Sequence, residues 1–298
     1  MKKWTLTLGV LAAGVALAGC GADKKEESKT ETVVYEQKDG TKIDVPKDPK
    51  RIVVLGRYTG DVLKFDGDVV GCDTYSKQDP LFKDDLKDAK VISEDNVEGI
   101  AELKPDLIIG LSTAKNADKI KKIAPTVLFN YGEYNYLDQP VEVAKVLNKE
   151  KEGKEWQTSF KKEMATTGKA IKKKMGNQTI SIIENFNKDL TLFGDNWARG
   201  GEILYQGMNL KMPAPAKKLT AKAGTANISV EALPKYVGDY LIVSKNNNQS
   251  TAFMESSTYK NLPAVKNKKV FVVDAAIFNF NDAMTLDYQL DYFKQHLS

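Results

Sequence analysis

Histidine and cysteine are nearly missing from this sequence of 298 residues. Its single histidine, His296, lies close to the C-terminus, so a serine or cysteine nucleophile would have no well-placed histidine base. Zinc, manganese and copper sites commonly use imidazole or thiolate ligands, and the chain offers almost none of either. The composition therefore argues against a hydrolase with such a nucleophile and against direct capture of a bare transition metal.

Motifs for nucleotide binding are missing as well. Neither a Gly-x-Gly-x-x-Gly turn nor a phosphate-binding loop ending in Gly-Lys-Ser/Thr follows any expected strand. The net charge of +4 is small and gives no basis for nucleic-acid binding. Hydrophobic residues nevertheless make up 42% of the chain, which is typical of a globular protein that buries a core.

The N-terminus is typical of an export signal. Lys2 and Lys3 precede the apolar run Trp4–Leu17, which is shorter than the roughly 20 residues that a membrane-spanning helix needs. Leu-Ala-Gly then precedes Cys20. Residues 1–19 are therefore predicted to form a signal peptide that is removed from the mature protein.

Leu-Ala-Gly-Cys resembles the lipobox of bacterial lipoproteins, in which the cysteine sulfur receives a diacylglyceryl group. The resemblance implies lipidation of Cys20 and anchoring to the cell membrane on its extracellular face, with ordinary signal cleavage nearby as the alternative. Residues 20–32 are rich in Lys, Glu, Ser and Thr, which predicts a flexible tether. Cys72 is then left without a disulfide partner, and its apolar neighbours predict a small buried side chain.

Strands and helices are expected to alternate after the tether, which predicts an α/β fold with mainly parallel strands. Asp39-Gly40 lies between two short strand-like runs and predicts a β-hairpin at the start. The expected strands are 33–37, 41–45, 51–55, 69–72, 105–110, 125–129, 179–184, 240–243 and 270–273, with a strand or turn at 190–194. The expected helices are 59–65, 97–104, 139–147, 202–208 and one beginning near Asp282.

Residues 153–175 form a highly charged segment with a single apolar stripe. The spacings of three or four residues within the stripe fit one face of a helix, which at about 1.5 Å per residue would be about 34 Å long. A helix of this length could link two lobes. The predicted organisation is an N-terminal lobe at 33–152, a linking helix at 153–176 and a C-terminal lobe at 177–298. The stripe consists of Trp156, Phe160, Met164, Thr167, Ile171 and Met175.

Aromatic and cationic residues gather where expected strands give way to loops or helices. Ligands of open α/β sheets bind at the carboxyl ends of the strands, so these residues predict an aromatic-lined groove between the lobes. Trp197 and Arg199 precede an expected helix, where acids are usually favoured over arginine. A core position for Trp197 and a surface position for Arg199 are the alternative. The candidates are Arg57, Tyr58, Tyr75, Tyr131, Tyr134, Tyr136, Trp197, Arg199, Phe278 and Phe280.

Several motifs resemble those of the iron-hydroxamate-binding lipoproteins of Gram-positive bacteria, which deliver ferric siderophores to ABC importers. Asp-Pro-Lys-Arg from Asp48 and Pro-Asp-Leu-Ile from Pro105 mark the wider class of helix-linked binding proteins. Gly-Asp-Asn-Trp-Ala-Arg-Gly-Gly from Gly194 marks the hydroxamate branch. The resemblance implies two α/β lobes joined by one long helix, with a ferric siderophore of the ferrioxamine or ferrichrome type between them. A monomer is the default expectation, and no enzymatic activity or resident cofactor is expected.

The resemblance implies roles for individual residues. Trp197 and Arg199 would contact the siderophore, with Arg199 donating hydrogen bonds to hydroxamate oxygens. Tyr131 would meet the ligand from the opposite lobe, and Phe278 and Phe280 would line the wall.

The siderophore itself would supply the metal ligands. Three hydroxamates fill the octahedral shell of Fe(III) and cancel its charge, and aromatic walls with one arginine suit such a neutral complex. Related binders have tyrosine before the Gly-Asp-Asn-Trp motif where this chain has Thr191 and Phe193, so the preferred siderophore stays open. A catecholate siderophore, with about three negative charges, could use Arg57 and Lys77. Haem or cobalamin on the same scaffold, and a surface hydrolase or adhesin, are further alternatives.

Glu98 and Glu231 lie at expected helix starts, one in each lobe. The helix dipole favours an acid at that position, which is a sufficient structural reason for both residues. In the resembling family a glutamate from each lobe contacts arginines of the permease, and the resemblance implies this docking role for Glu98 and Glu231. Exposed charges of this kind mostly steer association.

Overall fold

The computed structural model describes residues 31–298 apart from 187–188, and Glu31–Ser298 forms one compact unit. The predicted signal peptide at 1–19, the predicted lipidation site Cys20 and nearly all of the predicted tether lie outside the described residues. None of the helices in the described part combines the length and apolar character that a bilayer crossing requires.

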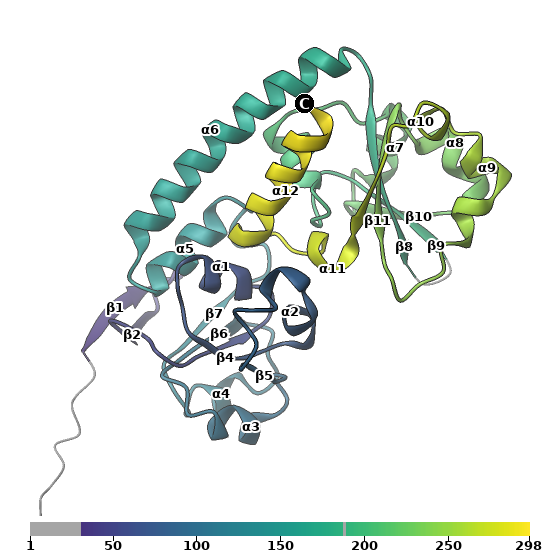
Figure 1. The fold of residues 1–298 in the computed structure, drawn as a ribbon. Helices are drawn as coiled ribbons and strands as arrows, with labels where there is room; N and C mark the ends of the chain where they lie inside the picture. Colours follow the sequence, from purple (N-terminus) through teal and green to yellow (C-terminus); the bar gives the residue numbers. More distant parts are fainter. Residues whose placement is uncertain (1–30, 187–188) are drawn as a thin grey trace, which may run out of the picture. The chain divides into compact units, whose positions relative to one another are not determined.

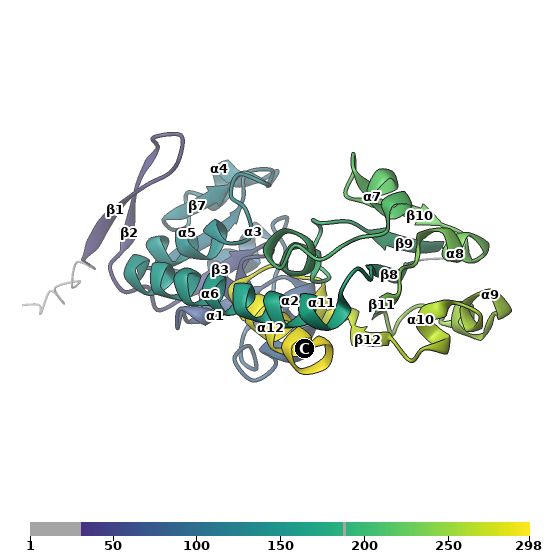
Figure 2. The same ribbon diagram turned by 90° about the horizontal axis from the view of Figure 1, so that it is seen from above.

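The described chain begins with the expected hairpin, in which β1 (Thr32–Glu36) and β2 (Lys42–Pro46) pair in antiparallel register. Gly40 at the turn has φ +87°, a left-handed conformation that glycine adopts without steric cost. The hairpin lies beside β7 (Thr126–Phe129) and α5 (Asp138–Val146), as Figure 2 shows, and the Tyr35 hydroxyl donates to Glu142 of α5 at 2.8 Å.

The first five-stranded sheet is parallel, with the order β5-β4-β3-β6-β7. Alternate residues of β3 (Ile52–Leu55) enter different cores, because Ile52 and Val54 pack with α1 and α5 whereas Val53 packs with α3 and α4. Coverage of both faces explains the unbroken apolar sequence of this strand. The remaining elements of this lobe are β4 (Val69–Cys72), β5 (Lys90–Val91), β6 (Leu107–Leu111), α1 (Thr59–Lys64), α2 (Thr74–Gln78), α3 (Val97–Glu102) and α4 (Ala117–Ile120).

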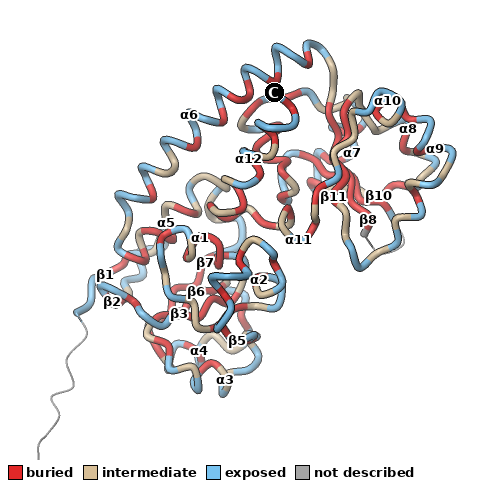
Figure 3. The backbone as a smooth tube through the Cα atoms, in the orientation of Figure 1, coloured by how far each residue is buried: buried red, intermediate tan, exposed pale blue. Residues whose placement is uncertain are grey.

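Helix α6 (Glu150–Met175) connects the two sheets along the chain and begins at Glu150, earlier than the predicted start at residue 153 (Figure 1). Glu150 lies in the first turn, where the positive end of the helix dipole favours an acid. The predicted stripe is buried at Phe160, Met164 and Ile171, while the opposite face is exposed along the helix (Figure 3). Packing of this stripe, rather than intrinsic propensity, holds such a charged helix in place.

The second five-stranded sheet is mixed and has the order β10-β9-β8-β11-β12. Strands β8, β11 and β12 are parallel, whereas β9 is antiparallel to both β8 and β10. This differs from the parallel arrangement that the alternation implied, because the short connection between β8 and β9 permits only an antiparallel pair. The strands are β8 (Ile180–Phe186), β9 (Asp189–Phe193), β10 (Thr225–Ile228), which the sequence analysis did not predict, β11 (Tyr240–Lys245) and β12 (Val270–Asp274).

Both faces of the second sheet are also covered. Ile180 and Ile182 pack with α6, α12 and the π-helical turn Glu202–Gly207, whereas Ile183 and Val243 pack on the other face with α7, α9 and α10. The helices of this lobe are α7 (Ala214–Thr220), α8 (Leu233–Tyr236), α9 (Ser257–Lys260), α10 (Pro263–Lys266), α11 (Ala275–Phe278) and α12 (Ala283–Leu297).

The closing helix α12 contacts α1 of the first lobe as well as α6 (Figure 1). Asp287 of α12 accepts a hydrogen bond from Trp156 Nε1 at 3.0 Å and pairs with Lys64 Nζ at 2.6 Å. Trp156 belongs to α6 and Lys64 to α1, so one carboxylate joins three elements. The predicted C-terminal lobe at 177–298 therefore ends in a helix that also packs on the N-terminal lobe.

Three buried carboxyl groups lie around the start of α12. Asp61 of α1 accepts hydrogen bonds from Ala283 N at 2.7 Å and Gln139 Nε2 at 2.8 Å, and Asp282 caps α12. Burial raises the pKa of Asp282 to about 6, and burial together with the charge of Asp282 raises the pKa of Asp61. Burial raises the pKa of Asp79 to about 7, and Asp79 Oδ2 has no hydrogen-bond partner among the described residues.

These carboxyl groups should make the protein less stable as pH rises towards neutrality. The folded-state pKa of Asp79, about 7, lies above the unfolded value of about 3.9, so the folded protein binds more protons between these two pH values. The free energy of unfolding should then fall as pH rises, by up to about 1.4 kcal/mol per pH unit from this group. We expect Asp79→Asn to flatten that fall, as measured by urea unfolding between pH 4 and 7.

The exposed carboxylate of Asp84 belongs to the same loop and provides the control, Asp84→Asn. Parallel stability profiles of the wild type and Asp79→Asn would contradict this account of Asp79.

Candidate functional site

Four consecutive residues adopt left-handed backbone conformations where β9 leads towards the π-helical turn. The φ angles are +76° at Trp197, +63° at Ala198, +59° at Arg199 and +84° at Gly200. Left-handed backbone costs roughly 1–2 kcal/mol for each residue other than glycine. Such strain persists only where surrounding contacts impose it, and it is typical of functional sites.

The contacts that impose this conformation are backbone hydrogen bonds to neighbouring segments. Arg199 N donates to Phe278 O at 2.8 Å, and Ala198 N donates to Glu202 Oε1 at 3.1 Å. Asn281 Nδ2 also donates to Glu202 Oε1, at 2.8 Å. Because Glu202 is buried, its pKa is raised by desolvation, although these donors oppose that effect.

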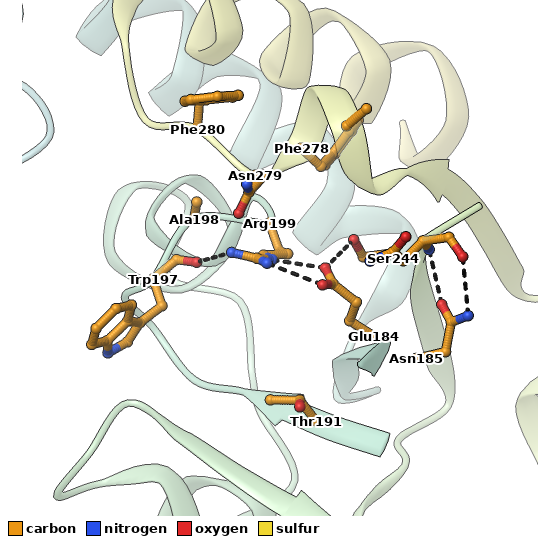
Figure 4. Close-up of polar contacts among 12 residues, drawn as sticks. Glu184, Asn185, Thr191, Trp197, Ala198, Arg199, Ser244, Phe278, Asn279 and Phe280 are labelled. Atoms are coloured by element: carbon orange, nitrogen blue, oxygen red, sulfur yellow. Dashed lines mark hydrogen bonds and ion pairs between the residues drawn. The ribbon is translucent and has the colours of Figure 1, made fainter. Parts of the chain in front are cut away.

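The Arg199 guanidinium is held by a buried carboxylate beneath the turn (Figure 4). Nε and Nη2 donate to the two carboxylate oxygens of Glu184 at 2.8 and 3.0 Å, and Glu184 Oε2 also accepts from Ser244 Oγ at 2.7 Å. The guanidinium carbon lies 4.6 Å from the centre of the Phe193 ring. A fork-to-fork ion pair and an aromatic surface thus fix the orientation of Arg199.

The Trp197 and Tyr131 side chains are exposed and lie close together although they come from different lobes. Their relative exposures are 48% and 68%, and their ring centres are 6.0 Å apart. Trp197 Nε1 donates to Ala223 O at 2.9 Å, which fixes the indole without covering it. Two large aromatic surfaces are therefore open to solvent at the junction of the lobes, as expected of a contact site for a ligand.

Arg57 supplies a second guanidinium at this junction. Its Nη1 donates to Asn279 O at 2.9 Å, which links the first lobe to the segment before α12. Its guanidinium carbon lies 5.4 Å from the centre of the Phe280 ring and 5.9 Å from that of the exposed Tyr75 ring. Desolvation lowers the pKa of Arg57, and the positive charge of Arg199 lowers it further. The two arginines therefore lie near enough to influence each other.

Two aromatic residues that were expected to line the groove wall belong to the core instead. Phe278 is 1% exposed and packs against Tyr292 and Phe293, and Phe280 is 2% exposed. The backbone of Phe278 supports Arg199 and the ring of Phe280 lies beside Arg57. These positions correct the prediction, because α12 covers the Phe278 ring and the Phe280 ring packs beside Phe82, so neither ring leaves much surface for a ligand.

Tyr58 is buried, whereas Tyr134 and Tyr136 are only partly buried. Tyr58 is 5% exposed and packs on Phe129 with ring centres 5.1 Å apart. Tyr134 meets the same phenylalanine edge-on, and the Tyr136 hydroxyl points to Met164 Sδ at 3.8 Å. Tyrosines that follow strands can turn inwards, which the sequence pattern did not distinguish from exposure.

Lys77 and Cys72 have structural surroundings. Lys77 Nζ donates to the carbonyl oxygens of Lys87 at 3.1 Å and Ala89 at 2.8 Å and also bonds Leu86 O, so its ammonium stabilises its own loop. This corrects the suggestion that Lys77 could meet an anionic ligand. Cys72 is fully buried, as predicted, and burial raises the pKa of its thiol to about 12.

The two predicted docking acids are exposed in different lobes. Glu98 lies in the first turn of α3, and Glu231 lies in the 3-10 turn Val230–Ala232. Hydrogen bonds from its own backbone and from the Ser229 side chain lower the pKa of Glu231. Both side chains are therefore accessible to a partner.

Sequence reasoning missed the residues that hold the two arginines. The candidates did not include Glu184, which pairs with Arg199, or Ser244, which donates a hydrogen bond to Glu184. They also did not include Asn279, which accepts a hydrogen bond from Arg57. An acid at the end of the expected strand 179–184, which contains three isoleucines, was the available signal for Glu184, because a charged residue in a buried strand needs a partner. For Asn279 no local signal existed, since its partner Arg57 lies 222 residues away in the sequence.

The converging groups can bind a ligand with oxygen acceptors and flat or apolar surfaces. Tyr75, Tyr131 and Trp197 offer exposed rings, and Arg57 and Arg199 offer N–H donors. Within the described ranges, no group of three His, Cys, Asp or Glu side chains could hold a metal ion directly. The chemistry present is recognition by stacking and charge-assisted hydrogen bonds.

Comparison with known proteins reveals extensive similarity. Residues 52–277 match the family model described as periplasmic binding protein. The iron(3+)-hydroxamate-binding protein FhuD of Bacillus subtilis (strain 168) is 34% identical over 315 residues, which cover 100% of this chain and 98% of that protein. The iron(3+)-hydroxamate-binding protein YxeB of the same organism is 32% identical, covering 98% and 95%. The structure of FhuD2 from Staphylococcus aureus with bound ferrioxamine B is 38% identical, has a TM-score of 0.77 and covers 84% of this chain and 98% of that chain.

The strained turn should not tolerate a side chain at Gly200. A Cβ atom there would lie 2.4 Å from Phe293 Cζ in the core, in addition to the cost of φ +84°. Gly132 has a similar φ of +74° with nothing within 4 Å, so Gly132→Ala is a matched control for the backbone term. We expect Gly200→Ala to reduce the free energy of unfolding by about 1–3 kcal/mol more than Gly132→Ala. Equal losses in denaturant titrations would contradict the packing around the turn.

Proposed function

The chain belongs to the periplasmic binding protein family, and we propose that it binds ferric hydroxamate siderophores of the ferrioxamine or ferrichrome type and delivers them to an ABC importer. The printed names of its relatives FhuD and YxeB and the ferrioxamine B bound to FhuD2 support the ligand class. The observation in this chain that carries the proposal is the pairing of exposed Trp197 and Tyr131 from opposite lobes beside Arg199.

The residues of the groove fit an uncharged ferric complex. Three hydroxamates satisfy all six coordination positions of Fe(III), so the protein is required only to hold the organic shell and its oxygen edges. Trp197, Tyr131 and Tyr75 would pack on that shell, while Arg57 and Arg199 would donate to its oxygens. The iron is the cargo of the siderophore, and the protein acts as a carrier without catalysis or a resident cofactor.

The charges beside the groove favour this ligand over a ferric triscatecholate. Such a complex carries about three negative charges and would gain from several uncompensated cations. Here the carboxylate of Glu184 pairs with Arg199, and Lys77 donates to backbone carbonyls of its own loop. Arg57 is left as the main uncompensated cation among the proposed ligand-binding residues.

We place the protein on the extracellular face of the cell membrane as a monomer, held there by lipid on Cys20. The relatives named as lipoproteins support the anchor, together with the Leu-Ala-Gly-Cys sequence. Glu98 and Glu231 would meet the permease from the two lobes, since both are exposed acids on separate lobes.

Truncation of Trp197 should abolish most of the siderophore affinity. Exposed aromatic anchors commonly cost at least about 2 kcal/mol on replacement by alanine, which corresponds to a loss of roughly 30-fold. Isothermal titration calorimetry of Trp197→Ala with ferrioxamine and ferrichrome would measure it without depending on tryptophan emission. The control is Tyr288→Ala, which removes another aromatic side chain that is 39% exposed. Wild-type affinity in Trp197→Ala would refute the proposed site.

Removal of both docking acids should separate uptake from binding. We expect Glu98→Ala with Glu231→Ala to retain siderophore affinity and to reduce uptake of labelled ferric siderophore by cells at least tenfold, because rim charges steer association with a partner. The control double variant, Glu102→Ala with Glu255→Ala, removes one exposed acid from each lobe, and Glu102 lies on the same helix as Glu98. Equal uptake by the two double variants would leave Glu98 and Glu231 as ordinary helix-start acids.

A further inference from the structure

Glu184 is a buried acid in the middle strand of the second sheet, directly behind the proposed ligand surface. It is 1% exposed, and its strand β8 lies between β9 and β11. Burial of an ionised carboxylate is costly unless hydrogen bonds and an opposite charge compensate it. Arg199 supplies both through its Nε and Nη2 atoms, and Ser244 on the neighbouring strand supplies a third hydrogen bond.

The ion pair leaves part of Arg199 able to bind a ligand. A guanidinium has five N–H donors in a rigid plane. Among the described residues, Nε and Nη2 each donate once to Glu184, and Nη1 donates once to Trp197 O at 3.2 Å. Two N–H donors therefore stay unused, and Figure 4 shows Glu184 and the Trp197 carbonyl on different sides of the guanidinium. The edge that remains can donate hydrogen bonds while the charge of the group is already balanced.

The neighbouring arginine has no such compensation. Arg57 bonds the backbone carbonyl and side-chain oxygen of Asn279 and lies against aromatic rings, and it forms no ion pair with any residue in the described part of the chain. Together Arg57, Arg199 and Glu184 leave one uncompensated positive charge beside the exposed rings. Removal of the carboxylate would leave two.

We infer that Glu184 is the positioning residue that orients Arg199 and sets the charge preference of the groove, so that an uncharged ferric trishydroxamate is selected over an anionic ferric complex. This inference rests on the proposed function. Orientation follows from the bidentate geometry, which fixes the plane of the guanidinium. Selectivity follows because a charge close to a ligand in a partly desolvated groove acts on an anionic complex and leaves a neutral one nearly unaffected.

The test compares two ligands of different charge in the chain from residue 21 onward, which contains the whole compact unit Glu31–Ser298. Ferrichrome, an uncharged ferric trishydroxamate, and a ferric triscatecholate are titrated by fluorescence quenching of Trp156 and Trp197. The measured quantity is the ratio of the two affinities. In Glu184→Gln we expect this ratio to shift towards the triscatecholate by at least roughly tenfold at low salt, and the shift to shrink at high ionic strength.

Two control variants separate charge preference from a loss of structure. Ser244→Ala removes a hydrogen bond from the same carboxylate without changing its charge, so both affinities should change together and their ratio should stay constant. Glu255→Gln changes the net charge of the chain equally at an exposed position of the same lobe and should also leave the ratio constant. If Glu184→Gln unfolds, the double variant Glu184→Gln with Arg199→Gln removes both charges and should lose hydrogen bonding to both ligands while keeping the wild-type sign of preference.

The outcomes separate a failure of the proposed function from a failure of the role assigned to Glu184. A wild-type protein that binds no ferric hydroxamate would overturn the proposed function itself. The role of Glu184 alone would be overturned if the wild type binds ferrichrome but the folded Glu184→Gln variant keeps the affinity ratio within about twofold of the wild-type ratio. A shift no larger than that of Ser244→Ala would overturn it as well.

Discussion

The segment Phe278–Asp282, which runs from the last residue of α11 to the N-cap of α12, is the constraint on which the proposed site depends. Its carbonyl oxygens accept hydrogen bonds from Arg199 N and Arg57 Nη1, which come from different lobes. Its Asn281 side chain donates to Glu202, and Glu202 in turn holds the strained turn at Ala198. Both arginines and the exposed tryptophan are therefore positioned by five residues that need not touch a ligand themselves.

Docking of α12 on α1 places this segment. Asp61 of α1 accepts from Ala283 N, and Gly60 leaves no room for a side chain, since a Cβ atom would lie 1.9 Å from Asp282 Oδ1. The close approach buries carboxyl groups that would be more stable in water, and their raised pKa values record that cost. The chain thus accepts buried charge at the lobe junction and left-handed backbone at Trp197–Gly200, both close to the proposed binding surface.

Recognition of a ferric siderophore at the proposed site requires no metal ligand from the protein. In the proposed complex the siderophore coordinates Fe(III) fully, so the contributions expected from the chain are stacking on Trp197 and Tyr131, hydrogen bonding from guanidinium edges and control of local charge. The near absence of histidine and cysteine agrees with a siderophore that supplies all of the iron ligands. In the proposed site the acid behind Arg199 would govern which ligand charge is preferred, because Glu184 both orients that arginine and balances its charge.

Local periodicity in the sequence determined the α/β class, the hairpin at Asp39-Gly40 and the buried stripe of α6, because each depends on residues only a few positions apart. The ligand class came instead from the resemblance of the motif around Trp197 to the iron-hydroxamate-binding lipoproteins. Only the tertiary structure decided that Phe278 is covered by α12 and that Arg199 is paired with Glu184. Burial and ion pairing depend on which distant segments meet, and neither α12 nor β8 carries a local signal that names its partner.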